Sequence, residues 1–125
     1  MPVSVQPGDI DGQNHVNNTV YLRWVQDVAI AHWKSLASLD AQEAIGWVVL
    51  RHEIDYRIPA NLGDEIGLRT WVGEASRLKF ERFTEVHRKA DNKLLAQART
   101  VWVPIDSQTG KPTRVSAEVR ARFST

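Results

Sequence analysis

The stretch DIDGQNHVNNTVYLRW, residues 9–24, decides how the rest of the chain is arranged. Its first half crowds two acids, a glycine, several amides and a histidine together. From Val16 onward, apolar residues recur at helical spacing, and Asn14 and Asn17 are both favoured helix N-cap residues. We therefore predict a helix from about Asn17 to Leu36. Its apolar face consists of Val20, Tyr21, Trp24, Val25, Val28 and His32.

The chain after this helix has the period of two that is typical of strands. Segments 48–58, 66–72 and 94–105 alternate apolar and polar residues. Phe83 is out of phase with Phe80, so we expect a bulge near Glu81 or Arg82. In the first strand, one face is expected to carry Val48, Leu50, His52, Ile54, Tyr56 and Ile58.

The order of elements predicts the fold class. A short strand at Val3–Val5 precedes the long helix, and four long strands with short turns follow it. Segment 38–44 is expected to be a turn or short helix, and segment 115–123 a short closing helix. No βαβ alternation occurs, so one helix packed on one antiparallel sheet, an α+β layer, is the expected architecture. Residues 1–125 suit a single domain.

Composition limits the classes of function. The chain has 125 residues, 42% of them apolar and 25% charged, with a net charge of +1 and no cysteine. It therefore has no strong field for nucleic acid or an anionic membrane, and no disulfide or thiolate chemistry. No apolar run approaches the roughly 20 residues of a membrane-spanning helix. The first residues lack the features of a signal peptide, so a cytoplasmic location is expected.

The polar residues before the helix allow two interpretations. They either cap the helix and shape a turn, or they carry out chemistry there. A calcium loop that starts at Asp9 would require Gly at position 14 and Glu at position 20, and the chain has Asn14 and Val20. His15 has no second histidine or acid at helical spacing to share a metal. No metal or other cofactor is therefore expected.

The pattern Asp9-x-Asp11-x-x-x-His15-Val16-Asn17-Asn18-x-x-Tyr21-Leu22-x-Trp24 resembles the signature of hotdog-fold thioesterases of the 4-hydroxybenzoyl-CoA thioesterase type. It is even more similar to the corresponding segment of the acyl-carrier-protein thioesterases. The resemblance covers nearly the whole chain. It implies a sheet wrapped around the long helix, a homodimer or a dimer of dimers, and hydrolysis of an acyl-CoA or acyl-carrier-protein thioester. The alternative is a hotdog acyl-binding module without turnover.

The resemblance also assigns roles to residues. Asp11 matches the catalytic carboxylate, which acts as nucleophile or as general base on water. The backbone N–H near Asn18 matches the donor that polarises the thioester carbonyl, and His15 is expected to orient the loop or the acyl group. Gln13 stands where the carrier-protein type has Asn, and Asp55 where that type has Glu. These differences leave the choice between CoA and carrier protein open.

Segment 77–82 has three cations, Arg77, Lys79 and Arg82. Two interpretations are open. The segment is either a solvated edge strand or a clamp for the phosphates of CoA or of a phosphopantetheine arm.

Overall fold

The computed structural model describes residues 1–76 and 78–123. A short strand, a single 3-10 turn and a long helix come first, and most of the sheet follows. Within the described ranges, no helix is long and apolar enough to cross a bilayer. The elements in chain order are β1 (Pro2–Ser4), η1 (Pro7–Asp9), α1 (Asn18–Leu36), α2 (Leu39–Ala44), β2 (Ile45–Tyr56), β3 (Glu65–Ala75), β4 (Phe80–Arg88), β5 (Lys93–Asp106) and α3 (Ala117–Phe123).

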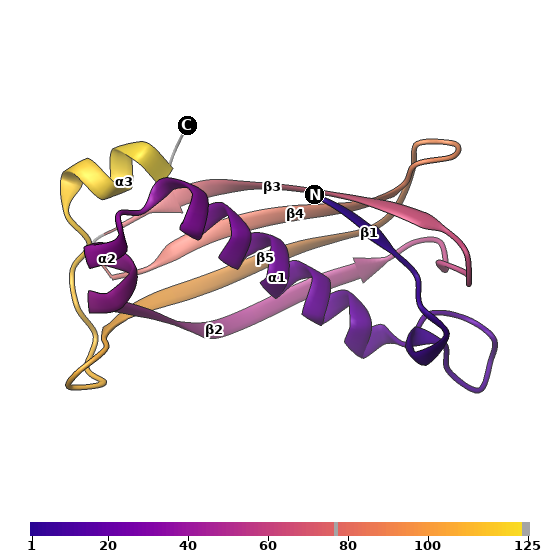
Figure 1. Cartoon of the computed structure of the whole chain (residues 1–125), viewed down its shortest axis with the longest axis horizontal. Coiled ribbons are helices and arrows are strands. Elements are labelled where there is room, and N and C mark those ends of the chain that lie inside the picture. Colours follow the sequence, from indigo (N-terminus) through magenta and orange to yellow (C-terminus); the bar gives the residue numbers. More distant parts are fainter. Residues whose placement is uncertain (77, 124–125) are drawn as a thin grey trace.

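The strands form one antiparallel sheet in the order β1-β3-β4-β5-β2. Helix α1 lies across one face of this sheet, and its start is at the end of the molecule opposite α2 and α3 (Figure 1). The α+β architecture predicted from the order of elements is therefore confirmed. Strand β2 is last in the order, so it has a neighbouring strand on one side only.

Helix α1 begins and ends where its capping groups predict. The Asn17 side chain accepts a hydrogen bond from the Thr19 N–H (3.0 Å), which is an N-cap bond. The Ala37 N–H donates to the Trp33 carbonyl at the other end (2.9 Å). The helix predicted from Asn17 to Leu36 is confirmed. The residues that it buries are Val20, Tyr21, Trp24, Val25, Val28, Ala29 and Trp33.

The apolar core between α1 and the sheet forms two clusters. The first core cluster surrounds Tyr21 and Trp24, near the start of the helix. The second core cluster surrounds Trp33, Phe80 and Trp102, near its end. The helix therefore rests on the sheet at two places.

A band of polar residues crosses the sheet between these two clusters. Thr84 and Thr100 are 1% and 0% exposed, and Arg82 is 4% exposed. Arg82 Nη1 donates to Thr70 Oγ1 (3.1 Å), and Thr100 Oγ1 lies 3.0 Å from His52 Nδ1. The bonds within this band let polar groups be buried without leaving donors and acceptors unsatisfied.

The predicted faces of β2 are wrong in the first half of the strand. Trp47 and Val49 face the helix and pack on the second core cluster. Val48 and Leu50 are instead 47% and 59% exposed. The pairing register shifts just after Val49, so the alternation changes phase and His52 again faces the helix. One extra residue at a bulge is enough to reverse the face of every residue on one side of it.

The bulge predicted near Glu81 or Arg82 lies in the neighbouring strand. The register shift occurs within 72–75 of β3, opposite residues 80–82 of β4. Strand β4 itself alternates without interruption, and Arg82 faces the helix while Phe83 faces away. The Phe83 ring stacks on Trp71 across the strands, with 5.8 Å between ring centroids. Phe83 is out of phase because it belongs to the outer face.

The hydroxyl of Tyr21 joins α1 to the segment after β2, and its removal tests that link. It accepts a hydrogen bond from the Ala60 N–H (3.0 Å), and Ala60 is 0% exposed. Because Tyr21→Phe leaves this buried N–H without a partner, we expect the free energy of unfolding to fall by about 1–3 kcal/mol. Tyr56→Phe is the matched control, since its hydroxyl bonds the Asn18 carbonyl at an exposed position.

We expect the control to change the free energy of unfolding by less than about 0.5 kcal/mol. Urea unfolding of both variants at one protein concentration measures the two values. Equal losses in the two variants would contradict the assigned role of the buried bond.

Candidate active site

An open pocket lies at the start of α1. It is formed by the loop that precedes the helix, the first turn of the helix, and the end of β2 with the segment that follows it. The space inside it is about 870 Å³ and includes the open mouth. Its lining residues are Asp11, Gln13, His15, Val16, Asn17, Asn18, Tyr21, Tyr56, Arg57, Ile58 and Pro59.

The loop of residues 10–16 is a small closed hairpin. An antiparallel bridge joins Ile10 to Val16, and the Asp11 N–H donates to the His15 carbonyl (2.8 Å). Asn14 takes a left-handed conformation with φ of 65°, which Asn tolerates better than most residues. The Val16 N–H donates to the Ala60 carbonyl (3.0 Å), which ties the loop to the segment after β2. The position of Asp11 is thus fixed by backbone bonds.

One oxygen of the Asp11 carboxylate is held by its own loop. Oδ1 accepts hydrogen bonds from the N–H groups of Gln13 (2.9 Å) and His15 (3.3 Å). Oδ2 accepts none from residues 1–76 or 78–123. The side chain is partly exposed and lines the pocket. The loop therefore orients the carboxylate and leaves its second oxygen available to a ligand.

Asp9 differs from Asp11 in its surroundings. It is 5% exposed and does not line the pocket. Its Oδ2 accepts from the Gln6 N–H (2.9 Å), and its Oδ1 accepts from Arg23 Nη2 of the helix (3.0 Å). Its carbonyl accepts from the Asn17 N–H (2.8 Å). Asp9 thereby fastens the loop to the first turns of α1.

The start of α1 offers a hydrogen-bond donor to the same pocket. Asn17 caps the Thr19 N–H with its side chain. The Asn18 N–H donates to no group in the described part of the chain, as expected for the first residue of a helix. Aligned peptide dipoles place roughly half a positive charge at such a terminus. A carboxylate and an anion-stabilising donor therefore line one pocket.

Two aromatic side chains complete one wall of the pocket. The Tyr56 hydroxyl donates to the Asn18 carbonyl (3.2 Å). Its ring meets the Tyr21 ring edge to face, with centroids 5.2 Å apart. Burial raises the pKa of both phenols above the ordinary value. Both hydroxyls therefore stay protonated at neutral pH. The Tyr56 hydroxyl can then act as a hydrogen-bond donor.

The structure brings together four of the predicted site residues and leaves out a fifth. Asp11, Asn18, His15 and Gln13 all line the pocket. Asp55 does not, because it lies on the opposite face of the sheet in a hollow beside Glu53 and Gln97. The side chain of Asp55 therefore points away from the start of the helix.

Two of the three cations of segment 77–82, Lys79 and Arg82, are not brought together as a clamp. Arg77 lies outside the described residues. Lys79 is exposed in the turn between β3 and β4, whereas Arg82 is buried below the helix. Arg82 therefore cannot join Lys79 in a solvent-facing phosphate site, and a phosphate role for Lys79 stays a prediction.

Sequence patterns assigned Tyr21 to a helix face and Tyr56 to a strand face, and gave neither residue a place in a site. Arg57 and the Ile58–Pro59 segment were also missed. No local signal marks these residues, since they reach the pocket only because the chain turns back at Pro59 and the Val16 N–H bonds Ala60.

Comparison with known sequences identifies relatives for this arrangement. A family model described as the thioesterase-like superfamily matches residues 5–123. The long-chain acyl-CoA thioesterase FadM of Escherichia coli K12 is 25% identical over 126 residues, covering 97% of this chain and 93% of that protein. A chloroplast palmitoyl-acyl carrier protein thioesterase of Gossypium hirsutum is 22% identical over 96% of this chain, which spans only 31% of that enzyme.

Solved structures share the fold over nearly the whole chain. A thioesterase from Thermus thermophilus, complexed with coenzyme A and Zn, is 26% identical with a TM-score of 0.85, covering 98% of this chain and 89% of that one. A 1,4-dihydroxy-2-naphthoyl-CoA thioesterase from Synechocystis is 21% identical with a TM-score of 0.84, covering 98% and 93%. The expected hotdog fold is confirmed.

Replacement of Asp9 tests whether this residue fastens the loop. Asp9→Ala removes two hydrogen-bond acceptors from a buried position, so we expect the free energy of unfolding to fall by about 1–3 kcal/mol. Asp27→Ala, at an exposed position on α1, should change it by less than about 0.5 kcal/mol. Urea unfolding gives both values. Amide hydrogen exchange should become faster in residues 10–16 only in Asp9→Ala, and unchanged exchange there would refute the fastening role.

Proposed function

The chain belongs to the thioesterase-like superfamily, and we propose that Asp11 and the start of α1 carry out its hydrolysis of acyl thioesters. The observation that supports this site is the pairing of a half-engaged carboxylate with a helix N-terminus at one pocket. Hydrolysis of an activated acyl group requires these two elements: an attacking oxygen and a preorganised hydrogen-bond donor for the oxyanion.

The reaction adds one water molecule across the thioester. A bond forms between the carbonyl carbon and an oxygen, the carbon–sulfur bond breaks, and the thiolate takes up a proton. Asp11 either attacks the carbonyl directly, with water then cleaving the mixed anhydride, or accepts the proton of the attacking water. In both routes the carbonyl oxygen becomes negative and accepts a hydrogen bond from the Asn18 N–H. Donors of this kind contribute about 3–4 kcal/mol to transition-state stabilisation.

The remaining groups at the pocket position the substrate. His15 and Gln13 are exposed at its rim, beside the carboxylate that their backbone N–H groups hold. They orient the loop and the thioester. Arg57 lines the opposite side, where a guanidinium suits the phosphate of the substrate's carrier.

The substrate is an acyl-CoA or an acyl-carrier protein, and the reaction takes place in the cytoplasm. FadM is named for acyl-CoA and the Gossypium enzyme for acyl-carrier protein. Both carriers present the thioester on a phosphopantetheine arm, so the pocket need only accommodate that arm and the carbonyl. A non-catalytic acyl-binding module is disfavoured because the loop holds Asp11 with one oxygen facing the pocket.

We also propose that the chain acts as a homodimer, alone or as the unit of a dimer of dimers. Strand β2 is a 12-residue edge strand. Its exposed apolar residues include Val48 and Leu50. Long edges with exposed apolar side chains readily pair with another strand, and two copies related by a two-fold axis would pair β2 with β2 antiparallel.

Replacement of Asp11 tests the catalytic proposal. Asp11→Asn keeps the shape and the acceptor oxygen that caps Gln13 and His15, but it removes the negative charge. We expect turnover of acyl-CoA to fall at least a hundredfold, about 2.7 kcal/mol in the barrier, while the fold is retained. Asp27→Asn is the matched control and should turn over at the wild-type rate. Steady-state thiol release measures the turnover of both variants. Near wild-type turnover in purified Asp11→Asn would contradict the proposed mechanism.

A charge in the middle of the β2 edge tests the dimer. If the two β2 strands pair over the full length Ile45–Tyr56, position 50 of one chain lies opposite Arg51 of the other, so the ammonium group of Leu50→Lys would meet a like charge and we expect dissociation to monomers at micromolar concentration. Leu62→Lys is the matched control, since Leu62 is 58% exposed and Leu50 is 59% exposed, and Leu62 lies outside β2. Light scattering should give a dimer mass or a multiple of it for the wild type and the control. A monodisperse, active wild-type monomer would contradict the proposal.

A further inference from the structure

The Tyr56 hydroxyl lines the candidate active site and has hydrogen-bonding capacity that the proposed mechanism does not use. It lies 3.2 Å from the Asn18 carbonyl oxygen. Because a carbonyl oxygen can only accept, the phenol proton is committed to this bond, and the lone pairs of the phenol oxygen are left as acceptors. That oxygen accepts no hydrogen bond from residues 1–76 or 78–123. A ligand in the pocket therefore meets an acceptor at this position.

The hydroxyl is fixed in place by contacts at both ends of its side chain. The Tyr56 ring meets the Tyr21 ring edge to face, with centroids 5.2 Å apart and an interplanar angle of 88°. Tyr21 is itself buried and accepts a hydrogen bond from the Ala60 N–H. Tyr56 remains 45% exposed and lines the pocket. The acceptor is thus preorganised and also accessible to a ligand.

The hydroxyl lies close to the donor proposed for the oxyanion. The N and O atoms of one residue are joined by three bonds, so they are no more than about 4 Å apart. Since the hydroxyl oxygen is 3.2 Å from the Asn18 oxygen, it lies within about 7 Å of the Asn18 nitrogen. A thioester whose carbonyl oxygen accepts from the Asn18 N–H therefore brings its neighbouring atoms within reach of Tyr56.

The two sides of a thioester offer different partners to such an acceptor. On the acyl side, the atoms next to the carbonyl group are carbon, which provides no hydrogen-bond donor. On the sulfur side, the phosphopantetheine arm carries an amide N–H after two methylene groups. Five bonds separate the nitrogen of this amide from the thioester carbonyl oxygen, a span comparable with the distance between Asn18 and the Tyr56 hydroxyl. The amide N–H is therefore the group that matches the acceptor.

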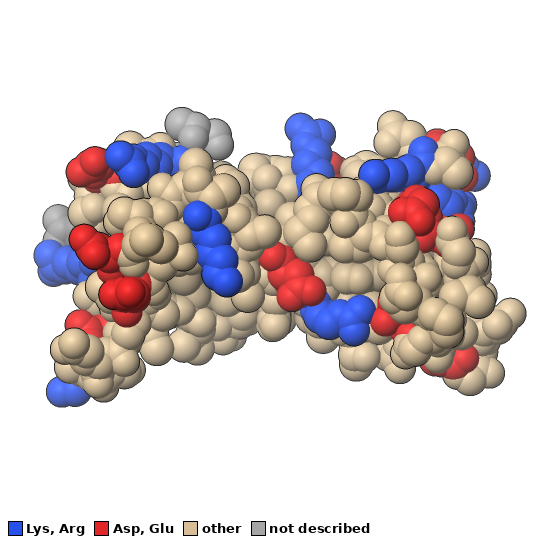
Figure 2. All heavy atoms as spheres, viewed as in Figure 1, with Lys and Arg blue, Asp and Glu red and all other residues tan. Residues whose placement is uncertain are grey.

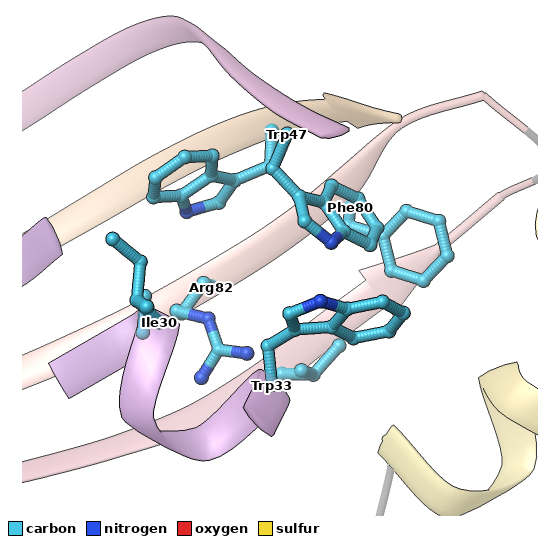
Figure 3. Close-up of a pocket in the computed structure, with 8 residues that line it drawn as sticks. Ile30, Trp33, Trp47, Phe80 and Arg82 are labelled. Atoms are coloured by element: carbon cyan, nitrogen blue, oxygen red, sulfur yellow. The ribbon is translucent and has the colours of Figure 1, made fainter. Parts of the chain in front are cut away.

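The surroundings of Tyr56 also suit the arm. Amide side chains, His15 and Arg57 line the same pocket, and Arg57 follows Tyr56 in the chain, where a guanidinium suits the phosphate further along the arm. The second pocket of the chain, under the far half of α1, differs in character. It encloses about 380 Å³, part of it open to solvent, and Trp33, Trp47 and Phe80 surround it (Figure 3). Polar groups of a substrate find their partners at the start of α1.

We propose that Tyr56 is a substrate-binding residue whose hydroxyl oxygen accepts a hydrogen bond from the first amide N–H of the phosphopantetheine arm, while its proton stays on the Asn18 carbonyl. The bond places the sulfur between the Asn18 N–H and the strand β2 end. The inference rests on the proposed function and adds to it the recognition of the part of the carrier next to the thioester.

Two small thioesters that differ in one atom test this bond. The first is the thioester of N-acetylcysteamine, which contains the amide N–H of the arm. The second is the thioester of 2-acetoxyethanethiol, in which an ester oxygen replaces that N–H. Both are prepared with octanoyl and with benzoyl groups. Division of each enzymatic rate by the hydroxide-catalysed rate of the same thioester removes differences in intrinsic reactivity.

We expect the wild-type enzyme to favour the amide thioester in kcat/KM by about threefold to tenfold, the discrimination of one neutral hydrogen bond. Tyr56→Phe keeps the ring and removes the acceptor, so its ratio should be near one. Tyr56→Leu also lacks the acceptor and should give the same ratio whatever its overall rate. Trp71→Phe is the matched control, because Trp71 is 40% exposed on the outer face of the sheet, and its ratio should equal the wild-type ratio.

The division between kcat and KM separates substrate binding from a structural role. The amide is not part of the reacting centre, so its bond is present in the bound substrate and in the transition state alike. Its loss should therefore raise KM for the amide thioester and change kcat by less than about twofold. If Tyr56 only steadied the first turn of α1, Tyr56→Phe would slow both thioesters equally and leave their ratio at the wild-type value.

A wild-type ratio near one overturns the inference and leaves the proposed function standing. A wild-type preference that persists in Tyr56→Phe and Tyr56→Leu overturns it as well, because another group would then accept the N–H. Hydrolysis of acyl-CoA without hydrolysis of the N-acetylcysteamine thioesters also overturns it, since binding would then depend on more distant parts of the arm. The absence of hydrolysis of every thioester, acyl-CoA included, overturns the inference and the proposed function together.

Discussion

The packing of one helix along one curled sheet is the constraint on which the rest of the structure depends. Helix α1 is 19 residues long and buries a continuous apolar stripe, and the sheet supplies apolar surface for it at two places. Apolar packing fills the side of the helix at the first core cluster, whereas its N-terminus is open to the candidate active-site pocket. Its N-terminus carries unpaired N–H groups and partial positive charge, so the pocket suited to a developing oxyanion lies there. Charged side chains are spread over the face that carries α1 without forming one dominant patch (Figure 2), so the local field at the helix start is not overridden by the surface around it.

The features that are local in sequence were predictable. The N-cap at Asn17 and the apolar spacing after it identified α1 to within one residue, because capping bonds and helical periodicity involve neighbours in the chain. The same holds for the loop before the helix. The Asp11 carboxylate accepts hydrogen bonds from the N–H groups of Gln13 and His15, which lie no more than four positions away in the sequence. Their grouping could therefore be inferred from the sequence. The polar residues also cap and shape the turn, so the two interpretations of that stretch describe one structure.

Features that depend on pairing between strands were harder to predict. The predicted face of Leu50 was wrong because a bulge is defined by pairing with the partner strand. Alternation within one strand does not reveal a bulge. Arg82 was read as part of a basic surface segment for a related reason. Its two neighbours in the sequence are Glu81 and Phe83, and both face outward, where Glu81 is paired with Arg99. Arg82 faces the interior although it is charged, because the alternation of faces continues through β4 without interruption.

This difference explains why the proposed catalytic groups are easier to detect from the sequence than the walls of a pocket between the helix and the sheet. The proposed catalytic groups all come from residues 11–18, and any relative that keeps the reaction in this form must keep their spacing. A pocket under the far half of α1, lined by Trp33, Arg82 and Trp102 among others, takes its walls from α1 and four strands. A wall residue in one strand can change without disturbing the sequence spacing of the others, so a pocket of this kind leaves no motif. Relatives at about a quarter identity share the fold, and such a level of identity leaves room for pocket walls to differ. In the proposed mechanism, the groups at the start of α1 determine which bond is broken, and pocket walls drawn from several strands can vary without altering that step.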